Sequence, residues 1–262
     1  MKFAKKSLGQ NFLIDKNIIK KIINSVDIKN KNVVEIGPGK GALTEEILKN
    51  NPKSLTLIEK DNSLFESLSL KFSNYNFLKF YNEDILNLNV EKIIKEETII
   101  FGNLPYNISS QILVKFILDN NFKFRALMFM FQKEMANRIL AKVNSKDYGR
   151  LSILSNWKFR VKKLFDIKPG SFNPRPKVES SILLFIEKTE KFPIGEPKNL
   201  EKITRILFNQ RRKKIRKSIN YIFKNNKKII NSLNLNLDLR PQNLDVKTYC
   251  NIASKYKELK TN

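Results

Sequence analysis

Short apolar runs alternate with stretches of helical spacing along most of the chain, and this alternation constrains the fold more than any other feature. The strand-like runs lie at 32–37, 55–59, 77–82, 98–102, 126–131, 151–165 and 180–188. Helical patterns separate the earlier runs, as in successive βαβ units. The pattern therefore predicts an α/β fold, a doubly wound, mostly parallel sheet of seven strands. Such a sheet binds its ligands beyond the carboxyl ends of its strands.

The two ends of the chain have helical patterns only. Near the start, apolar residues at 14, 18, 19, 22, 23 and 26 follow helical spacing after Asp15, a good N-cap. Residues 191–199, "KFPIGEPKN", break the strand–helix pattern and read as a linker. Only helical segments follow, with a break at Pro241. We therefore predict an α/β domain over 1–190 and a small all-α domain over 191–262.

The chain carries a formal net charge of +25, which favours a polyanionic partner such as nucleic acid. A biased composition rich in Lys and Asn is the alternative explanation, and the distribution of charge separates the two. Residues 191–262 hold 18 basic and 5 acidic residues, whereas residues 1–190 hold 32 and 20. Because the excess is concentrated in the C-terminal segment, the sequence predicts a small basic domain that binds nucleic acid.

Several classes of protein are disfavoured by composition. No apolar run approaches the roughly 18 residues of a membrane span, and the basic start lacks the apolar core of a signal peptide. The single cysteine, Cys250, excludes an internal disulfide and fits a reducing cytoplasm. One cysteine and no histidine argue against a metal site of the zinc type, and the usual histidine base is missing. We expect a cytoplasmic protein with no membrane or metal partner.

A glycine-rich turn follows the first predicted strand, in "VVEIGPGKGALTEEIL" at 33–48. Gly37, Gly39 and Gly41 let the backbone turn sharply and approach a ligand before a helix begins. Glu59 ends the second strand, where a carboxylate can accept both ribose hydroxyls, and Asp84 follows the third. Each carboxylate alone fits a solvated loop. Three successive strand ends together favour an adenosine-type cofactor. No G-K-[ST] follows the glycines, which excludes a Walker loop, but the spacing also allows an NAD-type site.

The fourth strand ends in "FGNLPYNIS", which is more than a turn requires. Asn103 faces the same crevice as the glycines, and Pro105 holds Leu104 extended. The Asn103 side-chain oxygen and the carbonyl of Leu104 or Pro105 can then converge on an exocyclic amine, which donates two hydrogens. Tyr106 offers a flat face for stacking a base. The alternative is a purely structural turn.

Five motifs in this order, "SLGQNFLID", "EIGPGKGALT", "NLPY", "FNPRPKVESS" and "NQRRKKIRKSI", resemble the ribosomal RNA adenine N6-dimethyltransferases. The resemblance spans about residue 7 to residue 219, and the basic C-terminal segment looks like the housekeeping small-subunit enzymes of the kasugamycin-sensitivity type. It implies a Rossmann-like methyltransferase fold, S-adenosyl-L-methionine as cofactor, and N6,N6-dimethylation of two adjacent adenines near the 3′ end of 16S rRNA. It also implies a role in maturation of the small subunit, with an immature 30S subunit as partner and a monomeric enzyme.

The same resemblance assigns residues to roles. The positions that correspond to cofactor contacts are Asn11, Leu13, Gly37, Glu59, Asp84 and Asn103, and the glycine turn itself adds Gly39 to the predicted cofactor set. The catalytic group comprises Asn103, Leu104, Pro105 and Tyr106, joined by Phe172, which falls where the family has an aromatic residue on the target base. A core role is the alternative for Phe172. Lys40 departs from the apolar residue common at its position and leaves the glycine spacing intact.

The motif "QRRKKIRK" at 210–217 is the predicted grip on RNA phosphates. Its basic residues are Arg211, Arg212, Lys213, Lys214, Arg216 and Lys217. A solvated helix face is the alternative. Two other functions are weighed for the whole chain: a DNA adenine methyltransferase, which "NLPY" argues against, and a non-catalytic RNA-binding or transcription factor, which would carry a damaged cofactor motif. The motif here is intact.

Overall fold

The central sheet has the predicted character. Within the residues that this computed structural model describes (10–95, 97–121 and 123–261), seven strands form one sheet in the order β4-β3-β2-β5-β6-β9-β7. The strands are β2 (Asn32–Ile36), β3 (Ser54–Ile58), β4 (Leu78–Tyr81), β5 (Ile99–Asn103), β6 (Ala126–Gln132), β7 (Phe159–Ile167) and β9 (Ser180–Glu187). Neighbouring strands from β4 to β6 run parallel, whereas β9 runs antiparallel to β6. The mostly parallel, doubly wound sheet is confirmed.

The order of the strands places a crevice at the centre of the sheet. The chain adds β3 and β4 on one side of β2, then returns to add β5 and β6 on the other side. Ile36 pairs with Gly102 across β2 and β5, so Gly37 and Asn103 emerge side by side at the carboxyl ends. A strand order that reverses at this point opens the ligand-binding crevice of a doubly wound fold.

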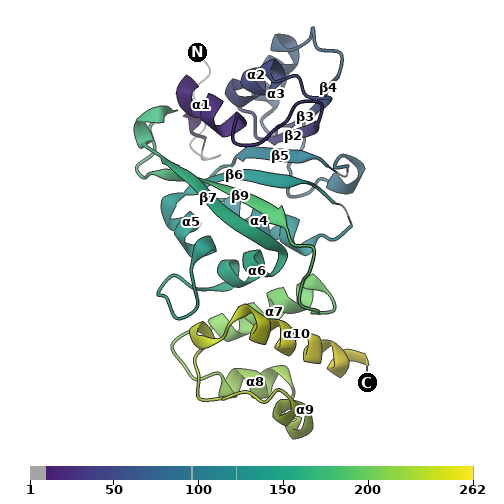
Figure 1. Cartoon of the computed structure of the whole chain (residues 1–262), viewed down its shortest axis with the longest axis vertical. Helices are drawn as coiled ribbons and strands as arrows, with labels where there is room; N and C mark the ends of the chain where they lie inside the picture. Colours follow the sequence, from purple (N-terminus) through teal and green to yellow (C-terminus); the bar gives the residue numbers. More distant parts are fainter. Residues whose placement is uncertain (1–9, 96, 122, 262) are drawn as a thin grey trace. The chain divides into compact units, whose positions relative to one another are not determined.

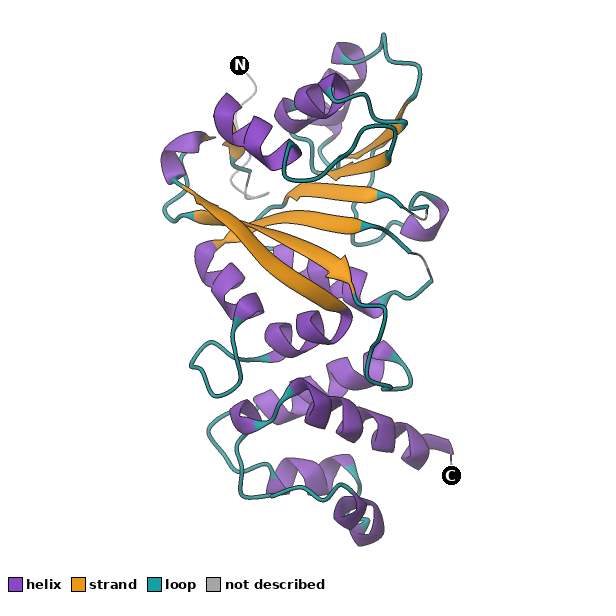
Figure 2. Ribbon diagram, viewed as in Figure 1, coloured by secondary structure: helices purple, strands orange, loops and turns teal. Residues whose placement is uncertain are grey.

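Helices follow the strands and cover the sheet, as Figures 1 and 2 show. In chain order they are α1 (Lys16–Ile23), α2 (Ala42–Lys49), α3 (Asn62–Lys71), α4 (Ser109–Leu118) and α5 (Lys133–Leu140). The Asp15 carboxylate caps α1 as predicted, because it accepts hydrogen bonds from the backbone N–H groups of Asn17 and Ile18. Both groups are unpaired within the first turn of a helix, so this side chain fixes where α1 begins.

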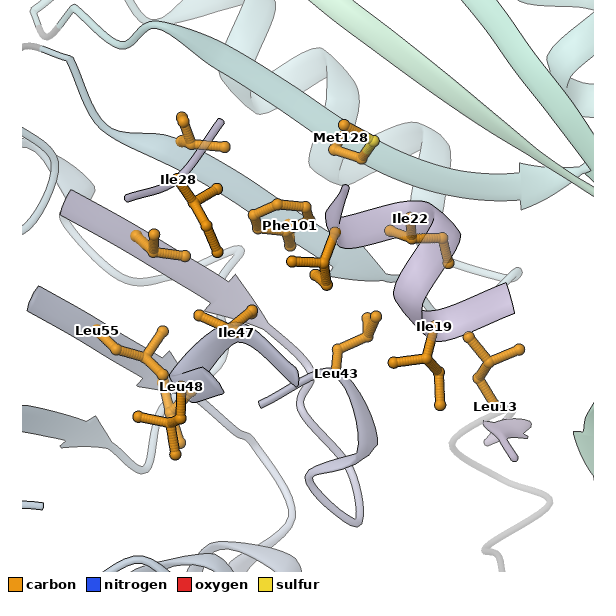
Figure 3. Packing of buried hydrophobic residues seen from close by; sticks show 14 of the residues in the cluster. Leu13, Ile19, Ile22, Ile28, Leu43, Ile47, Leu48, Leu55, Phe101 and Met128 are labelled. Atoms are coloured by element: carbon orange, nitrogen blue, oxygen red, sulfur yellow. The ribbon is translucent and has the colours of Figure 1, made fainter. Parts of the chain in front are cut away.

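Helices α1 and α2 bury their apolar stripes against the sheet. Ile19 and Ile22 from α1 meet Leu43 and Ile47 from α2 in one cluster, which includes Phe101 from the sheet (Figure 3). All five side chains are at most 5% exposed. Burying one such side chain stabilises the fold by about 1.5–3 kcal/mol. This packing holds the start of α2, and with it the glycine turn, against the strand ends.

A two-stranded antiparallel sheet lies outside the main one. It pairs β1 (Phe12–Leu13) with β8 (Phe172–Asn173), so that Phe12 lies opposite Asn173 and Leu13 opposite Phe172. The backbone N–H of Ile14 donates to the Ser171 carbonyl and continues the pairing. These contacts bring residues near the start of the chain to the segment that precedes β9.

The contacts divide the chain into two compact units. The first contains residues up to 115, 120–136 and 161–187; the second contains 116–119, 137–160 and 188–262. The segment 137–160 therefore groups with the C-terminal helices, and a domain boundary at 190/191 stays a prediction. The helices of the second unit are α6 (Arg150–Lys158), α7 (Pro197–Phe208), α8 (Arg216–Ile222), α9 (Lys227–Ser232) and α10 (Val246–Thr261).

One secondary-structure prediction was wrong in part. Residues 151–165 were expected to form a strand, but Arg150–Lys158 form helix α6 and only Phe159–Ile167 form β7. Helix α6 is buried on most sides, so its sequence carries no alternation of polar and apolar positions from which the period could be read. Beyond β9 the described residues form helices and no further strand, and a 3₁₀ turn at Pro241–Asn243 precedes α10 as the proline suggested.

Candidate active site

The glycine turn between β2 and α2 has a backbone that other residues adopt poorly. Gly37 and Gly39 have φ values of 67° and 60°. A Cβ on Gly39 would lie 2.9 Å from two ring carbons of Phe12, so a side chain there would displace the Phe12 ring. At Gly37 the nearest atom to a Cβ would be the Asn103 carbonyl oxygen, at 3.9 Å. The turn therefore keeps its backbone close to the crevice.

Glu59 holds the glycine turn and the start of α3 together. Its carboxylate accepts the N–H of Gly39 at 3.1 Å and the N–H of Asp61 at 2.9 Å. Burial raises the pKa of Glu59, and the two N–H donors oppose that rise. Each carboxylate oxygen retains further lone pairs, so Glu59 can also accept from hydroxyl groups of a ligand in the crevice.

Asp84 lies beyond β4 on the same edge of the sheet. Its carboxylate accepts from the Lys60 ammonium at 2.8 Å and from the backbone N–H of Leu86 at 2.9 Å. Burial acts to raise the pKa of Asp84, but the hydrogen bonds from Lys60 and Leu86 outweigh it and hold the pKa below its ordinary value. Asp84 is therefore a charged acceptor at neutral pH.

Glu35 is a functional candidate that the sequence reasoning missed. It lies within β2, is 1% exposed, lines the crevice, and accepts a 2.6 Å hydrogen bond from the Thr44 hydroxyl. Burial, with a smaller contribution from the charge of Glu59, raises the pKa of Glu35 to about 8. The available signal was a carboxylate inside the apolar run "VVEIG", because an acidic residue is rarely buried in a strand without a purpose.

The side chains after β5 explain the sequence "NLPY". The Asn103 amide donates from Nδ2 to the Asn11 carbonyl at 3.0 Å, which fixes the side chain and leaves its oxygen as an acceptor. Leu104 is 1% exposed and folds back over Gly102, where a Cβ would lie 2.6 Å from a Leu104 methyl. The leucine therefore anchors the turn, and it can do so because residue 102 has no side chain.

The two carbonyls considered as partners of Asn103 differ in availability. The Pro105 carbonyl accepts the N–H groups of Ile108 and Ser109, at 3.1 and 3.0 Å, as the chain enters α4. Both of its lone pairs are thus engaged. The Leu104 carbonyl is consequently the better candidate for a second acceptor beside the Asn103 oxygen.

Tyr106 is held by a contact from far along the sequence. Its hydroxyl and the Ser180 hydroxyl lie 2.6 Å apart, 74 residues away in the chain. Burial raises the pKa of Tyr106, with the Ser180 hydrogen bond acting in the opposite direction. The phenol is therefore neutral at physiological pH, and its ring forms part of the crevice wall.

One pocket at the strand ends brings the predicted residues together. It is lined by all of the predicted cofactor residues: Asn11, Leu13, Gly37, Gly39, Glu59, Asp84 and Asn103. It is also lined by Leu104, Pro105 and Tyr106. Buried acceptors beside an apolar wall and a backbone that leaves room at the glycines suit an adenosine-type ligand.

Phe172 lies elsewhere. Its side chain is 3% exposed and belongs to the hydrophobic cluster that includes Leu13 and Ile182. Phe172 is therefore placed as a core residue, which was the alternative to a role at the target base. A role on the target base stays a prediction, and it would require the ring to leave the core.

The basic residues at 210–217 differ from one another in their contacts. Arg211 is anchored: its guanidinium donates to Gln242 and to the carbonyls of Ser145 and Lys146. Lys214 and Arg216 both pair with Asp238 at 3.2 Å. The other three predicted phosphate contacts, Arg212, Lys213 and Lys217, are exposed.

No helix within the described residues has the length and apolar character that crossing a membrane requires.

The fold and the pocket together define a Rossmann-like enzyme class with a nucleoside-type ligand at the centre of the sheet. The sequence profile of the ribosomal RNA adenine dimethylase family matches residues 1–258. The ribosomal RNA small subunit methyltransferase A of Pelagibacter ubique is 51% identical over 259 residues, which cover 98% of each chain. The chain belongs to the ribosomal RNA adenine dimethylase family.

Solved structures agree with this assignment. A dimethyladenosine transferase from Plasmodium falciparum superposes with a TM-score of 0.80 at 27% identity, covering 95% of this chain and 98% of its own. The 23S rRNA methyltransferase ErmE superposes with a TM-score of 0.66 at 22% identity, covering 94% and 100%, a likeness of fold.

Proposed function

We propose that this enzyme transfers methyl groups to N6 of two adjacent adenines near the 3′ end of 16S rRNA, giving N6,N6-dimethyladenosines, within an immature 30S subunit. The chain is a methyltransferase of small-subunit rRNA that uses S-adenosyl-L-methionine. The proposal adds the target adenines, a role in subunit maturation, a monomeric enzyme and a cytoplasmic location. The observation that carries it is the Asn103 amide, oriented by Asn11 beside the glycine turn.

The residues of the crevice fit the cofactor. Glu59 would accept hydrogen bonds from the ribose hydroxyls and Asp84 from the adenine amino group. The glycine turn would leave space for the rest of the cofactor. Bound there, S-adenosyl-L-methionine supplies an electrophilic methyl group. The strand end that carries Asn103 adjoins the glycine turn, so Asn103 would lie close to a cofactor held there.

The acceptors after β5 would activate the target amine. Its lone pair is delocalised into the adenine ring, so N6 is a poor nucleophile. The Asn103 oxygen and the Leu104 carbonyl would each accept one N6 hydrogen, which favours a pyramidal nitrogen with a localised lone pair. Tyr106 would stack on the base once it has left its helix. Once methylated, the nitrogen is strongly acidic and can lose its proton to water, so no dedicated base is required, and the lack of histidine agrees with this chemistry. Rate enhancement would then rest on placement and electrostatics.

Methyl transfer to subunits at defined maturation stages tests the proposal. Purified enzyme is incubated with methyl-labelled S-adenosyl-L-methionine and unmethylated immature small subunits, and the RNA is digested to nucleosides. We expect labelled dimethyladenosine from two adjacent positions, and none from fully methylated subunits. The Asn103→Ala variant should lose about 100–1,000-fold in single-turnover rate, as for removal of one preorganised polar group. Label only at other rRNA positions, or transfer only to duplex DNA in a parallel incubation, would overturn the proposal.

A further inference from the structure

Helix α8 carries an exposed aromatic side chain inside a segment without acidic residues. Residues 202–237 contain 11 Lys and Arg residues and no Asp or Glu. Tyr221 lies within this segment and is 74% exposed, more than any other aromatic side chain described as exposed. A tyrosine ring exposed at a helix surface keeps a flat apolar face available to a partner, and covering that face would release its burial energy.

The surroundings of Tyr221 indicate what would cover it. Ser218, Ile219 and Ile222 form the buried side of α8, so Tyr221 lies on the outer side. Lys217 is one turn before it on the same side, and Lys224 follows the C-cap residue of the helix, Phe223; both lysines are exposed. An exposed aromatic ring with an exposed lysine four residues before it and another three residues after it matches an unpaired nucleotide, whose base stacks while its flanking phosphates meet the cations.

We propose that Tyr221 is a stacking platform for an unpaired rRNA base, with Lys217 and Lys224 on the flanking phosphates. This site deepens the proposed function and rests on it, since it assumes an RNA substrate. It is separate from the methyl-transfer pocket and acts in RNA docking, without choosing the methylated base. Base stacking tolerates any base, whereas the cations supply the salt-dependent part of affinity.

Binding of the full-length protein to a fluorescein-labelled single-stranded 12-mer RNA and to immature small subunits tests this site. Tyr221→Leu should weaken binding by about fivefold to 100-fold, the range for losing one base–aromatic stack, with an unchanged salt slope. Lys217→Gln should instead reduce the slope by about 0.7. Tyr221→Phe should bind within twofold of the wild type. Phe192→Leu is the matched control, because Phe192 is also exposed (45%) but lies outside the acid-free segment.

The outcomes separate this site from the proposed function. If the wild type methylates subunits but Tyr221→Leu binds RNA like the wild type, the stacking site is wrong and the proposed function stands. Equal losses in Tyr221→Phe and Tyr221→Leu would also overturn it, since the ring would then not be the contact. If the wild type transfers no methyl group to subunits, the proposed function fails, whatever Tyr221→Leu does to binding.

A second, independent observation concerns the 2.6 Å contact between the hydroxyls of Tyr106 and Ser180. Ser180 is fully buried and begins β9, the strand that runs antiparallel to β6. Because β9 is reversed, its first residue lies at the edge where the parallel strands end, beside "NLPY". The topology thus brings Ser180 to Tyr106, which lines the crevice.

The geometry points to Ser180 as a positioning residue that holds the Tyr106 ring in its stacking orientation. This positioning role of Ser180 rests on the proposed role of Tyr106 in stacking the target base. Ser180→Ala and Tyr106→Phe should each lower kcat about threefold to 30-fold with little change in KM for either substrate, and the double variant should be no worse than either single one. Ser181→Ala is the matched control, because this neighbouring buried serine bonds to Asp166 instead.

Losses that multiply in the double variant would show that the two hydroxyls act separately and would overturn the positioning role. So would a kcat of Ser180→Ala equal to that of Ser181→Ala. Neither result touches the proposed function, which is scored by dimethyladenosine formation in the wild type.

Discussion

Single carboxylates set the electrostatics of the crevice. Glu59 and Asp84 end up with opposite pKa shifts although both lie at strand ends, because Glu59 is buried among neutral donors and Asp84 faces an ammonium group. Glu35 is shifted furthest, because its strand is covered on both faces. The site thus contains charged and protonated carboxyl groups close together, which lets it both accept and donate hydrogen bonds.

Removing the Glu59 carboxylate tests the cofactor site. We expect Glu59→Gln and Asp84→Ala to weaken S-adenosyl-L-methionine binding by about 10–150-fold, which corresponds to a lost hydrogen bond to a charged acceptor of about 1.5–3 kcal/mol. Isothermal titration calorimetry measures this directly. Glu66→Ala on the exposed side of α3 is the control and should bind normally. Wild-type affinity in both crevice variants would contradict the assignment.

Titration of Glu35 should appear in the pH dependence of stability. The folded-state pKa of Glu35 is raised to about 8. Its contribution to stability is therefore fully present below the unfolded-state pKa of 4.5 and is lost as pH rises towards 8. Glu35→Gln keeps an acceptor for Thr44 but does not ionise. The free energy of unfolding measured with denaturant should therefore become larger for the variant than for the wild type from pH 5 to pH 9, by up to about 4 kcal/mol. Parallel pH curves for the two proteins would exclude a buried, protonated Glu35.

At the scale of elements, the last carbonyl groups of α4 are bound by a buried lysine from another helix. Lys158, at the end of α6, is 1% exposed and donates to the carbonyls of Phe116, at 2.8 Å, Ile117 and Asp119. The last carbonyls of a helix have no partners within it, and a cation there also meets the negative end of the helix dipole. Lys158 therefore joins the end of α4 to α6 in the second compact unit.

Lys158→Met should lower stability while sparing the cofactor site. Leaving buried carbonyls unsatisfied costs about 1–3 kcal/mol, which corresponds to a fall of roughly 2–12 °C in Tm for a chain of this size. Differential scanning calorimetry gives the shift, and S-adenosyl-L-methionine affinity should stay within twofold. Lys162→Met is the control, because Lys162 is exposed on β7. A Tm equal to that of this control would show that the carbonyls find water instead.

At the scale of the whole molecule, charge is unevenly distributed. The C-terminal 72 residues carry a net +13, yet the contacts show that these cations are not equivalent. Arg211 uses its hydrogen bonds within the fold, whereas Arg212, Lys213 and Lys217 are exposed to solvent. We expect all of them to add to the long-range attraction to RNA, and we predict direct phosphate contact for the exposed subset.

Changing Arg212, Lys213 and Lys217 together to Gln should flatten the salt dependence of subunit binding. Each lost phosphate contact reduces the slope of log K against log[salt] by about 0.7–0.9, so we expect a total change of about 2 to 3 with an unchanged Tm. Arg211→Gln should behave in the opposite way, with a lower Tm and a smaller change in slope. An unaltered slope in the triple variant would place the RNA interface elsewhere.

The sequence by itself determined the features that local pattern encodes. The alternation of strands and helices, the glycine turn, the acidic strand ends and "NLPY" are contiguous or regularly spaced, so their periods and turn chemistry can be read directly. Parallel strands bring their carboxyl ends to one edge of a sheet, so the pattern alone is enough to group Glu59, Asp84 and Asn103, and all three line the same pocket.

The tertiary structure alone decided what depends on burial and on contacts between distant segments. It placed Phe172 in the core, gave Tyr106 its partner Ser180, and protonated Glu35. It also made Arg211 part of the fold and turned the first half of 151–165 into a helix. In each case the residue type is compatible with two environments, and the packing of neighbours that are remote in sequence selects one of them.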